Sequence, residues 1–290
     1  MAVNRSLWQD EAGIAGVIRE TAIPTTVASN EILVKVNAWA MNPADAMVQD
    51  VALPFIKYPL ILGEDIAGTV EKVGSEATGK FKVGDRVLGL ALGAAVFKPE
   101  QGAFQDAGKS VFIWGGSSGV GSNAIQLCKG AGFEVITTCS AHNFEYVKRL
   151  GADKVFDYKD PSVIDRVVAE LDRGECIGIL QAAGDVSPSC QVASRSKQKL
   201  RVAASNPVPD GVAPADIEAK MIFATGGAVI YHETSPATFA GYLPEALALG
   251  LYQVAPTPQI VSTKGLEGIQ EALNLLKKGI SAKKLVTLAN

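Results

Sequence analysis

Ser110-Val-Phe-Ile-Trp-Gly-Gly-Ser-Ser-Gly-Val-Gly121 decides the fold of this chain. An apolar run that ends at Trp114 breaks into a turn of glycine and serine, and a segment of small and apolar residues follows it. This order is typical of a buried strand that leads into a helix whose N-terminus binds a dinucleotide pyrophosphate. Free backbone N–H groups and the positive end of the helix dipole would face the anion there.

The glycines of this turn have separate expected roles. Gly116 permits the tight turn, Gly119 lies at the helix start, and Gly121 lets the helix close onto the strand. Ser118 stands where the pattern Gly-x-Gly-x-x-Gly has its middle glycine, so an ordinary glycine-rich turn stays an alternative. The residues expected to bind the cofactor here are Gly116, Ser117, Ser118, Gly119, Val120 and Gly121.

The composition describes an ordinary soluble protein with a sizeable core. With 290 residues the chain is long enough for two domains, at about 100–200 residues each. A formal net charge of −3 without a basic patch argues against nucleic acid or an anionic membrane as a partner. Neither a signal peptide nor an apolar stretch of membrane-spanning length is evident.

The four cysteines are scattered along the chain and form no Cys-x-x-Cys pair and no cluster with metal-ligand spacing. Such thiols suit a reducing compartment, where they behave as small apolar residues. We therefore expect a cytoplasmic protein.

The chain divides by pattern near residue 106. Before it, strands separated by glycine turns are expected at residues 31–37, 66–73 and 82–88, a spacing that suggests a small barrel. After it, strands and helices alternate, which predicts a doubly wound parallel sheet of the α/β class. The strands expected there lie at residues 111–114, 134–138, 154–157, 176–180 and 199–203, and the helices at 123–130, 144–150 and 163–171. The C-terminal part predicts a helix over 266–276 and a closing strand over 284–288.

Several motifs outside the turn resemble those of the medium-chain dehydrogenase/reductase superfamily, and the resemblance covers nearly all of the chain. They are Gly63-Glu-Asp-Ile-Ala-Gly68, Val73-Gly74, Gly84-Asp-Arg-Val87 and Gly102-Ala-Phe-Gln105. The resemblance implies a Rossmann domain with a doubly wound parallel sheet and a GroES-like β-barrel domain. The corresponding division is a catalytic barrel over residues 1–105, an NADP-binding Rossmann domain over 106–250, and a segment over 251–290 that returns to the barrel.

Within that superfamily the chain is most similar to zinc-independent, NADPH-using members. Residues 114–126, 143–148 and 281–286 resemble stand-alone enoyl reductases that act in trans with polyketide synthases, and the quinone oxidoreductases are a more distant likeness. This implies a reductase of activated double bonds whose substrate is a small-molecule or carrier-bound enoyl thioester. It also implies a polyketide synthase as a candidate partner and a monomer or homodimer. A quinone or alkenal reductase is one alternative, and a non-catalytic NADP- or partner-binding protein is another.

Zinc is not expected. The zinc alcohol dehydrogenases that resemble this superfamily place a cysteine in the early loop and a histidine in a Gly-His-Glu motif. Here residues 38–45 hold no cysteine, and Glu64 stands where that histidine would be. A zinc site needs about three or four such ligands within reach, and neither of the two histidines lies in the barrel region.

The end of the second strand of the Rossmann pattern bears on the choice of cofactor. NAD-specific sites carry Asp or Glu about twenty residues past the glycine turn, but residues 137–143 hold no carboxylate. A carboxylate there would repel a 2′-phosphate, whereas Ser140 and Asn143 could donate hydrogen bonds to it. We therefore expect NADPH.

The resemblance adds further expected cofactor contacts. His142 stands where relatives often carry a lysine, and Tyr158 resembles a tyrosine near the adenosine end. Lys283 matches a basic residue that relatives use on the cofactor phosphates. Each of these three could instead be an ordinary surface residue. Loops near the nicotinamide would contribute Ala183, Phe223 and Thr225, which could instead be simple strand ends.

Asn42 is the candidate catalytic residue, because it corresponds to a position that lines the cleft of such reductases. Its alternative role is to cap the turn before Pro43. Quinone-reductase-like relatives have a tyrosine where Met47 falls, so that candidate proton donor is missing. No nucleophile set of Ser-His-Asp or Cys-His type emerges, and the sequence assigns no general acid.

A segment is missing where the cleft should be completed. In relatives Gly102-Ala-Phe-Gln105 begins a strand, and several dozen residues follow before the strand of the glycine turn. Here Gln105 runs directly into Asp106-Ala-Gly-Lys-Ser110. We therefore expect an incomplete barrel with an uncovered apolar surface, a Rossmann half that folds, and a compromised cleft.

Overall fold

The computed structural model describes residues 3–52, 56–63, 65–90, 109–222 and 237–289. The chain forms two compact units: unit 1 consists of Met1–Gly93 and Pro258–Asn290, and unit 2 consists of Ala94–Thr257. Residues 105 and 106, where the sequence predicts a domain boundary and the start of the missing segment, lie outside the described residues.

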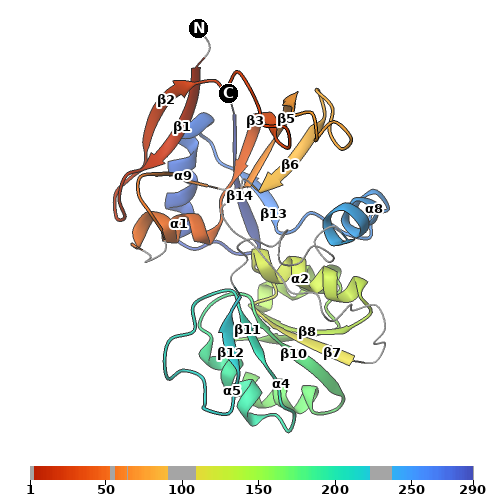
Figure 1. Cartoon of the computed structure of the whole chain (residues 1–290). Coiled ribbons are helices and arrows are strands. Elements are labelled where there is room, and N and C mark those ends of the chain that lie inside the picture. The colour runs from red at the N-terminus through yellow and green to blue at the C-terminus, as the bar shows by residue number, and fades with distance from the viewer. Residues whose placement is uncertain (1–2, 53–55, 64, 91–108, 223–236, 290) are drawn as a thin grey trace. The chain divides into compact units, whose positions relative to one another are not determined.

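Unit 2 is built on a six-stranded sheet with the order β12-β11-β10-β7-β8-β9 (Figure 1). Its strands are β7 (Lys109–Trp114), β8 (Glu134–Cys139), β9 (Lys154–Asp157), β10 (Glu175–Gln181), β11 (Val202–Ala204) and β12 (Ala219–Met221). All neighbouring strands run parallel. The chain winds outward from β7 to β9, crosses back to β10, and then winds outward in the other direction. The predicted doubly wound parallel sheet is confirmed.

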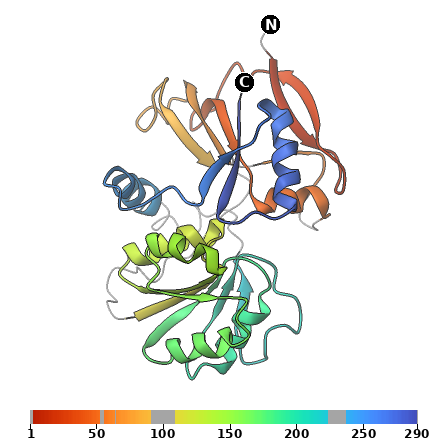
Figure 2. The same ribbon diagram turned by 180° about the vertical axis from the view of Figure 1, so that it is seen from behind.

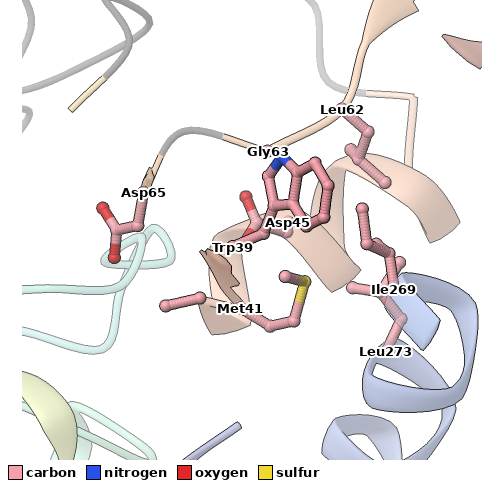
Figure 3. A pocket seen from close by; sticks show the side chains of 9 residues that line it. Trp39, Met41, Asp45, Leu62, Gly63, Asp65, Ile269 and Leu273 are labelled. Carbon is pink, nitrogen blue, oxygen red and sulfur yellow. The ribbon is translucent and has the colours of Figure 1, made fainter. Parts of the chain in front are cut away.

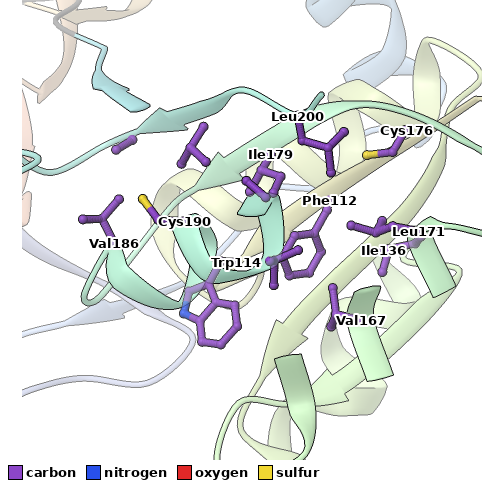
Figure 4. Close-up of a cluster of buried hydrophobic side chains, with 14 of the residues drawn as sticks. Phe112, Trp114, Ile136, Val167, Leu171, Cys176, Ile179, Val186, Cys190 and Leu200 are labelled. Carbon is purple, nitrogen blue, oxygen red and sulfur yellow. The ribbon is translucent and has the colours of Figure 1, made fainter. Parts of the chain in front are cut away.

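Helices cover both faces of this sheet. They are α2 (Gly119–Gly130) and α3 (Phe144–Arg149) on one face, and α4 (Val163–Leu171) and α5 (Ser187–Arg195) on the other. Phe112 and Ile113 are both fully buried, because successive side chains of β7 point to opposite faces and each face has its own core. Figure 4 shows the core beneath α4 and α5, where Phe112 lies among aliphatic side chains. Burial on both faces explains why the strand is a continuous apolar run.

Unit 1 contains a five-stranded and a three-stranded sheet. The larger sheet has the order β13-β14-β3-β5-β6, with β13 (Thr257–Ile260), β14 (Lys283–Leu288), β3 (Ile32–Ala40), β5 (Asp65–Val73) and β6 (Arg86–Leu90). The smaller sheet has the order β2-β1-β4, with β1 (Val3–Gln9), β2 (Val17–Ala22) and β4 (Leu60–Ile61). These curled, largely antiparallel sheets confirm the expected GroES-like domain.

Two helices complete the core of unit 1: α1 (Pro43–Asp50) and α9 (Gly265–Lys277). The apolar face of α9 lies against β14 and β1 (Figure 2). Leu273 of the helix and Leu285 of the strand are completely buried there. The spacing of Leu266, Ile269 and Leu273 places their side chains on one side of the helix, as the sequence predicts.

The strand β6 forms one end of the five-stranded sheet, and no further strand pairs with it in the described part of unit 1. Leu88 in this strand is 85% exposed. A free strand edge with an exposed leucine is a surface that favours association.

The described residues also form the 3₁₀ turn η1 (Ala141–Asn143), the π-helical turn η2 (Ala237–Tyr242) and α8 (Leu243–Ala248). Across the described residues, every helix is too short or too polar to cross a membrane.

Candidate functional site

The glycine turn directly follows β7 and is tied to the end of β8 by two hydrogen bonds. The amide of Gly115 donates to Thr138 Oγ1 (3.1 Å), and that of Gly116 donates to Thr138 O (2.8 Å). Gly115, with a φ of +89°, has the left-handed conformation of the turn, so the prediction that Gly116 permits the turn is wrong. Gly116 is needed for close packing instead, because a Cβ on it would overlap Thr137 Oγ1 and lie 2.9 Å from Ile125 Cδ1.

Helix α2 starts at Gly119, as the sequence predicts, and lies against the glycine turn. Ser118 caps the helix, since its Oγ accepts a hydrogen bond from Gly121 N (3.0 Å). A Cβ on Gly121 would overlap Gly115 O, so a glycine at this position allows the close approach that the sequence predicts.

Three amides at this helix start find no acceptor among the described residues, namely those of Ser117, Gly119 and Val120. Apart from its chain neighbours, no atom lies within 4 Å of the position that a Cβ of Gly119 would take, and Val120 is 47% exposed. These N–H groups therefore lie in an open place at the positive end of a 12-residue helix. A pyrophosphate group fits this arrangement, because each N–H can donate to an anionic oxygen.

The loop after β10 lies beside the glycine turn. Ala182 N donates to Trp114 O (2.9 Å), and the position of a Cβ on Gly115 is 3.1 Å from Ala183 Cβ. Strands β7 and β10 are neighbours at the point where the winding of the sheet reverses, which is where doubly wound proteins bind their ligands. The two other residues expected near the nicotinamide, Phe223 and Thr225, lie outside the described residues.

Gln181, the last residue of β10, is a buried polar residue that the sequence reasoning missed. Its Nε2 donates to Gly184 O (2.6 Å), which fixes the loop that contains Ala183. Its Oε1 has no hydrogen-bond partner in the described part of the chain. The sequence does contain a feature that could have identified Gln181: it is a polar residue at the carboxyl end of an apolar strand, next to the expected nicotinamide loop.

The expected adenosine contacts gather at the carboxyl ends of β8 and β9. Ser140 is half-buried and its carbonyl accepts from Asn143 N (2.8 Å), while His142 of the same turn is exposed. Tyr158 is 44% exposed, and its amide donates to Cys139 O (3.3 Å). The structure therefore brings Ser140, His142 and Tyr158 to one edge, whereas the side chain of Asn143 is buried.

Helix α3 is connected to the glycine turn by a short chain of hydrogen bonds. Tyr146 OH donates to Ser122 Oγ (2.9 Å), and Ser122 Oγ donates to Gly116 O (3.2 Å). Burial raises the pKa of the Tyr146 phenol above its ordinary value, which already lies well above neutral pH. The cofactor loop is thus supported from β8 and from α3.

Side chains on the flank of α2 hold the segment that leads back to unit 1. Asn123 Oδ1 accepts from Tyr252 OH (2.6 Å), and Asn123 Nδ2 donates to Ala255 O (3.1 Å). Gln126 binds the backbone of Gln253 twice, through Oε1 (2.7 Å) and Nε2 (3.1 Å). We call these contacts of Asn123 and Gln126 the amide clamp.

In unit 1 three polar side chains from distant parts of the chain meet. Lys284 Nζ donates to Asn42 Oδ1 and to Asp65 Oδ2 (3.0 Å), and Asn42 Nδ2 also donates to Asp65 Oδ2 (3.0 Å). We call these three residues the polar cluster. Asn42 is the N-cap residue of α1, but its side chain bonds to Asp65 and Lys284. Lys283, the predicted phosphate ligand, is exposed, and within the described residues its neighbour Lys284 is the lysine that bonds to this cluster.

Asp45 lies behind the polar cluster, in the first turn of α1. It is only 5% exposed and accepts a hydrogen bond from Asn42 N (2.6 Å). Burial raises the pKa of its carboxyl group to about 6, although the bond from Asn42 opposes the shift. Figure 3 shows a small pocket beside it, lined by Trp39, Ala40, Met41, Asp45, Leu62, Gly63, Asp65, Ile269 and Leu273.

The described residues contain no group of three or more His, Cys, Asp or Glu side chains that could hold a metal ion. Between the oxygens of Asn42 and Asp65 lies the ammonium group of Lys284. This donor set does not fit a zinc ion, which prefers thiolate and imidazole ligands.

Comparison with protein families gives two matches. Residues 28–143 match the model of an alcohol dehydrogenase GroES-like domain, and residues 119–193 match that of a zinc-binding dehydrogenase. Dehydrogenase azaJ of Aspergillus niger is 39% identical over 334 aligned positions, which cover 93% of this chain and 94% of the relative. Trans-enoyl reductase himH of Aspergillus japonicus is 31% identical over 341 positions, which cover 98% and 97%. Among solved structures, the CurK enoyl reductase has a TM-score of 0.76 at 19% identity and covers 99% of both chains.

The alignment with one relative is longer than this chain. The alignment with dehydrogenase azaJ runs over 334 positions, although this chain has 290 residues. This relative therefore has several dozen residues without a counterpart in this chain, as expected if a segment is missing.

Proposed function

The chain belongs to the medium-chain dehydrogenase/reductase superfamily, and from this premise we propose that it is an NADPH-dependent reductase of activated double bonds. The proposed substrate is an enoyl thioester, free or attached to a carrier such as that of a polyketide synthase. The observation that carries the proposal is the set of open amides at Ser117, Gly119 and Val120, beside the point where the winding of the sheet reverses. The relative himH, named a trans-enoyl reductase, supports the substrate class.

The described residues fit a nicotinamide dinucleotide along one edge of unit 2. The open amides of α2 would hold the pyrophosphate, and Ser140 and Tyr158 would contact the adenosine end. Ala183 would lie next to the nicotinamide, since it packs beside Gly115 at the turn. When bound, NADPH supplies a hydride to the β-carbon of the unsaturated thioester, and the enolate that results takes up a proton.

The polar cluster of unit 1 supports a reaction without zinc. Lys284 places a positive charge beside Asn42 and Asp65, and a positive charge can stabilise an enolate oxygen in the way a metal ion would. Asn42 is the proposed catalytic residue, with Lys284 and Asp65 fixing the orientation of its amide group.

The proposal is tested by titrating the protein with NADPH and following cofactor fluorescence, and then by following NADPH loss with a crotonyl thioester and with a quinone. We expect binding, turnover of the thioester, and unchanged rates after treatment with a strong zinc chelator. Binding without turnover of either acceptor would instead show a non-catalytic NADP-binding protein. Faster turnover of the quinone would assign the chain to the quinone reductases, and loss of activity on chelation would contradict the zinc-free reaction.

A further inference from the structure

We propose that Lys159 is the cation that recognises the 2′-phosphate of NADPH, and that the ring of Tyr158 holds its ammonium group at the adenosine edge. This inference rests on the proposed use of NADPH, and it adds a specificity-determining residue that follows from the position of β9. The sequence resemblance assigns Tyr158 and His142 to this edge but does not include Lys159, which follows Tyr158 in the chain.

The backbone fixes where Lys159 lies. Asp157, the last residue of β9, pairs with Cys139, the last residue of β8. The amide of Tyr158 then donates to Cys139 O (3.3 Å), so Tyr158 and Lys159 leave the sheet beside Ser140. The turn expected to bind the ribose 2′-phosphate and the segment with Lys159 therefore share one edge of the sheet.

The side chain of Lys159 is placed over an aromatic ring. Its Nζ lies 5.9 Å from the centroid of Tyr158, a distance within the range of cation–π attraction. Tyr158 is 44% exposed, so a ligand can reach the ammonium group beside its ring. The ring limits the conformations of the long Lys159 side chain. Less conformational entropy is therefore lost when this side chain binds a phosphate.

Lys159 differs in its ion pairing from two cations on α3 and α4, the helices that contact β9. Lys148 pairs with Glu145 (3.0 Å), and Arg166 pairs with Asp160 (2.6 Å). Within the described part of the chain no carboxylate lies within ion-pair distance of Lys159 Nζ.

A cation is also needed at this edge because a carboxylate lies there. Residues 137–143 hold no acid, but pairing of the strands brings Asp157 opposite Cys139. Asp157 Oδ1 accepts a hydrogen bond from the backbone N–H of Lys159 (3.0 Å). A phosphate bound beside Ser140 would be repelled by this carboxylate, and the positive charge of Lys159, two residues further along the chain, would offset the repulsion.

The experiment measures the binding of two nucleotides without any reaction. Adenosine 2′,5′-bisphosphate and adenosine 5′-monophosphate are titrated calorimetrically into the wild-type protein, Lys159→Met, and the control Lys278→Met. Lys278 is exposed at the end of α9 and belongs to unit 1, so its substitution changes the net charge equally at a residue outside the unit that contains this edge. We expect Lys159→Met to weaken bisphosphate binding about fivefold to tenfold, as for a lost charge-assisted hydrogen bond, and to leave monophosphate binding within twofold.

Each outcome decides between the inference and the proposed function. If the wild-type protein prefers the bisphosphate and Lys159→Met keeps that preference, Lys159 does not recognise the 2′-phosphate and only this inference fails. Equal weakening of both nucleotides would overturn it as well, because the effect would not depend on the 2′-phosphate. If the wild-type protein binds both nucleotides equally, the preference for NADPH fails, and if it binds neither, the proposed function fails with it.

Discussion

The glycine turn of unit 2 and the polar cluster of unit 1 are built on opposite principles. The turn is made of backbone atoms from one continuous stretch, and it works because side chains are absent where Gly116 and Gly121 approach their neighbours. The polar cluster is made of side chains from three distant elements, and it depends on the charges of Asp65 and Lys284. We therefore expect the turn to be sensitive to substitutions that add volume, and the polar cluster to substitutions that remove a charge.

The largest effect is expected from Gly121→Ala, which tests the sensitivity of the turn to volume. The new methyl group would overlap Gly115 O and lie 2.7 Å from Gly116 Cα, and backbone atoms cannot move aside easily. We expect unfolding free energy to fall by about 3 kcal/mol, and NADPH affinity to fall at least tenfold. Thermal unfolding and fluorescence titration measure the two effects.

Gly119→Ala is the matched control for added volume in the turn. Its methyl group would meet no atom within 4 Å, so stability should change by less than about 0.5 kcal/mol. NADPH binding should still weaken, because the methyl group stands in front of the open amides. A stable Gly119→Ala variant with unchanged affinity would show that the amides do not hold the cofactor.

The second prediction concerns the charge state of Asp45, behind the polar cluster. Burial raises its pKa from 3.8 to about 6, so the folded state binds the proton more tightly than the unfolded state. This contribution to stability is complete below pH 4 and is lost as the pH rises through 6. It amounts to about 2–3 kcal/mol, at 1.36 kcal/mol for each pKa unit.

Asp45→Asn removes this titration and keeps an oxygen that can accept from Asn42 N. Urea unfolding of both proteins from pH 4 to pH 7 isolates the effect, since the other titrating groups are common to both. The difference in unfolding free energy should change by the stated amount across that range. A difference that is constant with pH would contradict the buried carboxyl group.

The third prediction separates Lys284 from Lys283. Lys284→Met leaves Asp65 and Asn42 without their cation, and we expect a loss of about 1.5 kcal/mol because this ion pair is partly exposed. Lys283→Met, at an exposed position of the same strand, should change unfolding free energy by less than about 0.5 kcal/mol. Equal effects in thermal unfolding would mean that the polar cluster does not stabilise unit 1.

The smallest effect is expected from Tyr146→Phe, which removes one hydrogen bond that supports the turn. Ser122 Oγ keeps its bond to Gly116 O, so the loss should be about 0.5–1 kcal/mol. NADPH affinity should fall about twofold to threefold. If affinity falls as much as in Gly121→Ala, hydrogen bonds rather than volume control the turn, and the comparison of the two sites is wrong.

The sequence predicted the parallel sheet well because each strand and helix carries its own local pattern. The helix over Val163–Leu171 and the strand over Lys154–Asp157 have the predicted bounds. In contrast, β1 and α1 were not predicted, since β1 contains Asn4, Arg5 and Ser6 and owes its burial to neighbouring elements.

The structure separates adjacent residues of the candidate sites that the sequence does not, while the phosphate contact of Lys283 stays a prediction. Gly115 and Gly116 are adjacent, and only the φ angles tell which of them makes the turn. Lys283 and Lys284 are adjacent in β14, where successive side chains point to opposite faces. A motif therefore locates such a residue within the chain, but the pleat of the strand decides which lysine meets Asn42.

The amide clamp gives α2 a structural role besides its proposed role in binding the cofactor. The chain passes from unit 2 to unit 1 just after the segment that Asn123 and Gln126 bind, so this segment is attached to the helix that carries the open amides. One helix thus carries both the open amides at its first turn and, on its flank, the side chains that hold the segment leading out of unit 2.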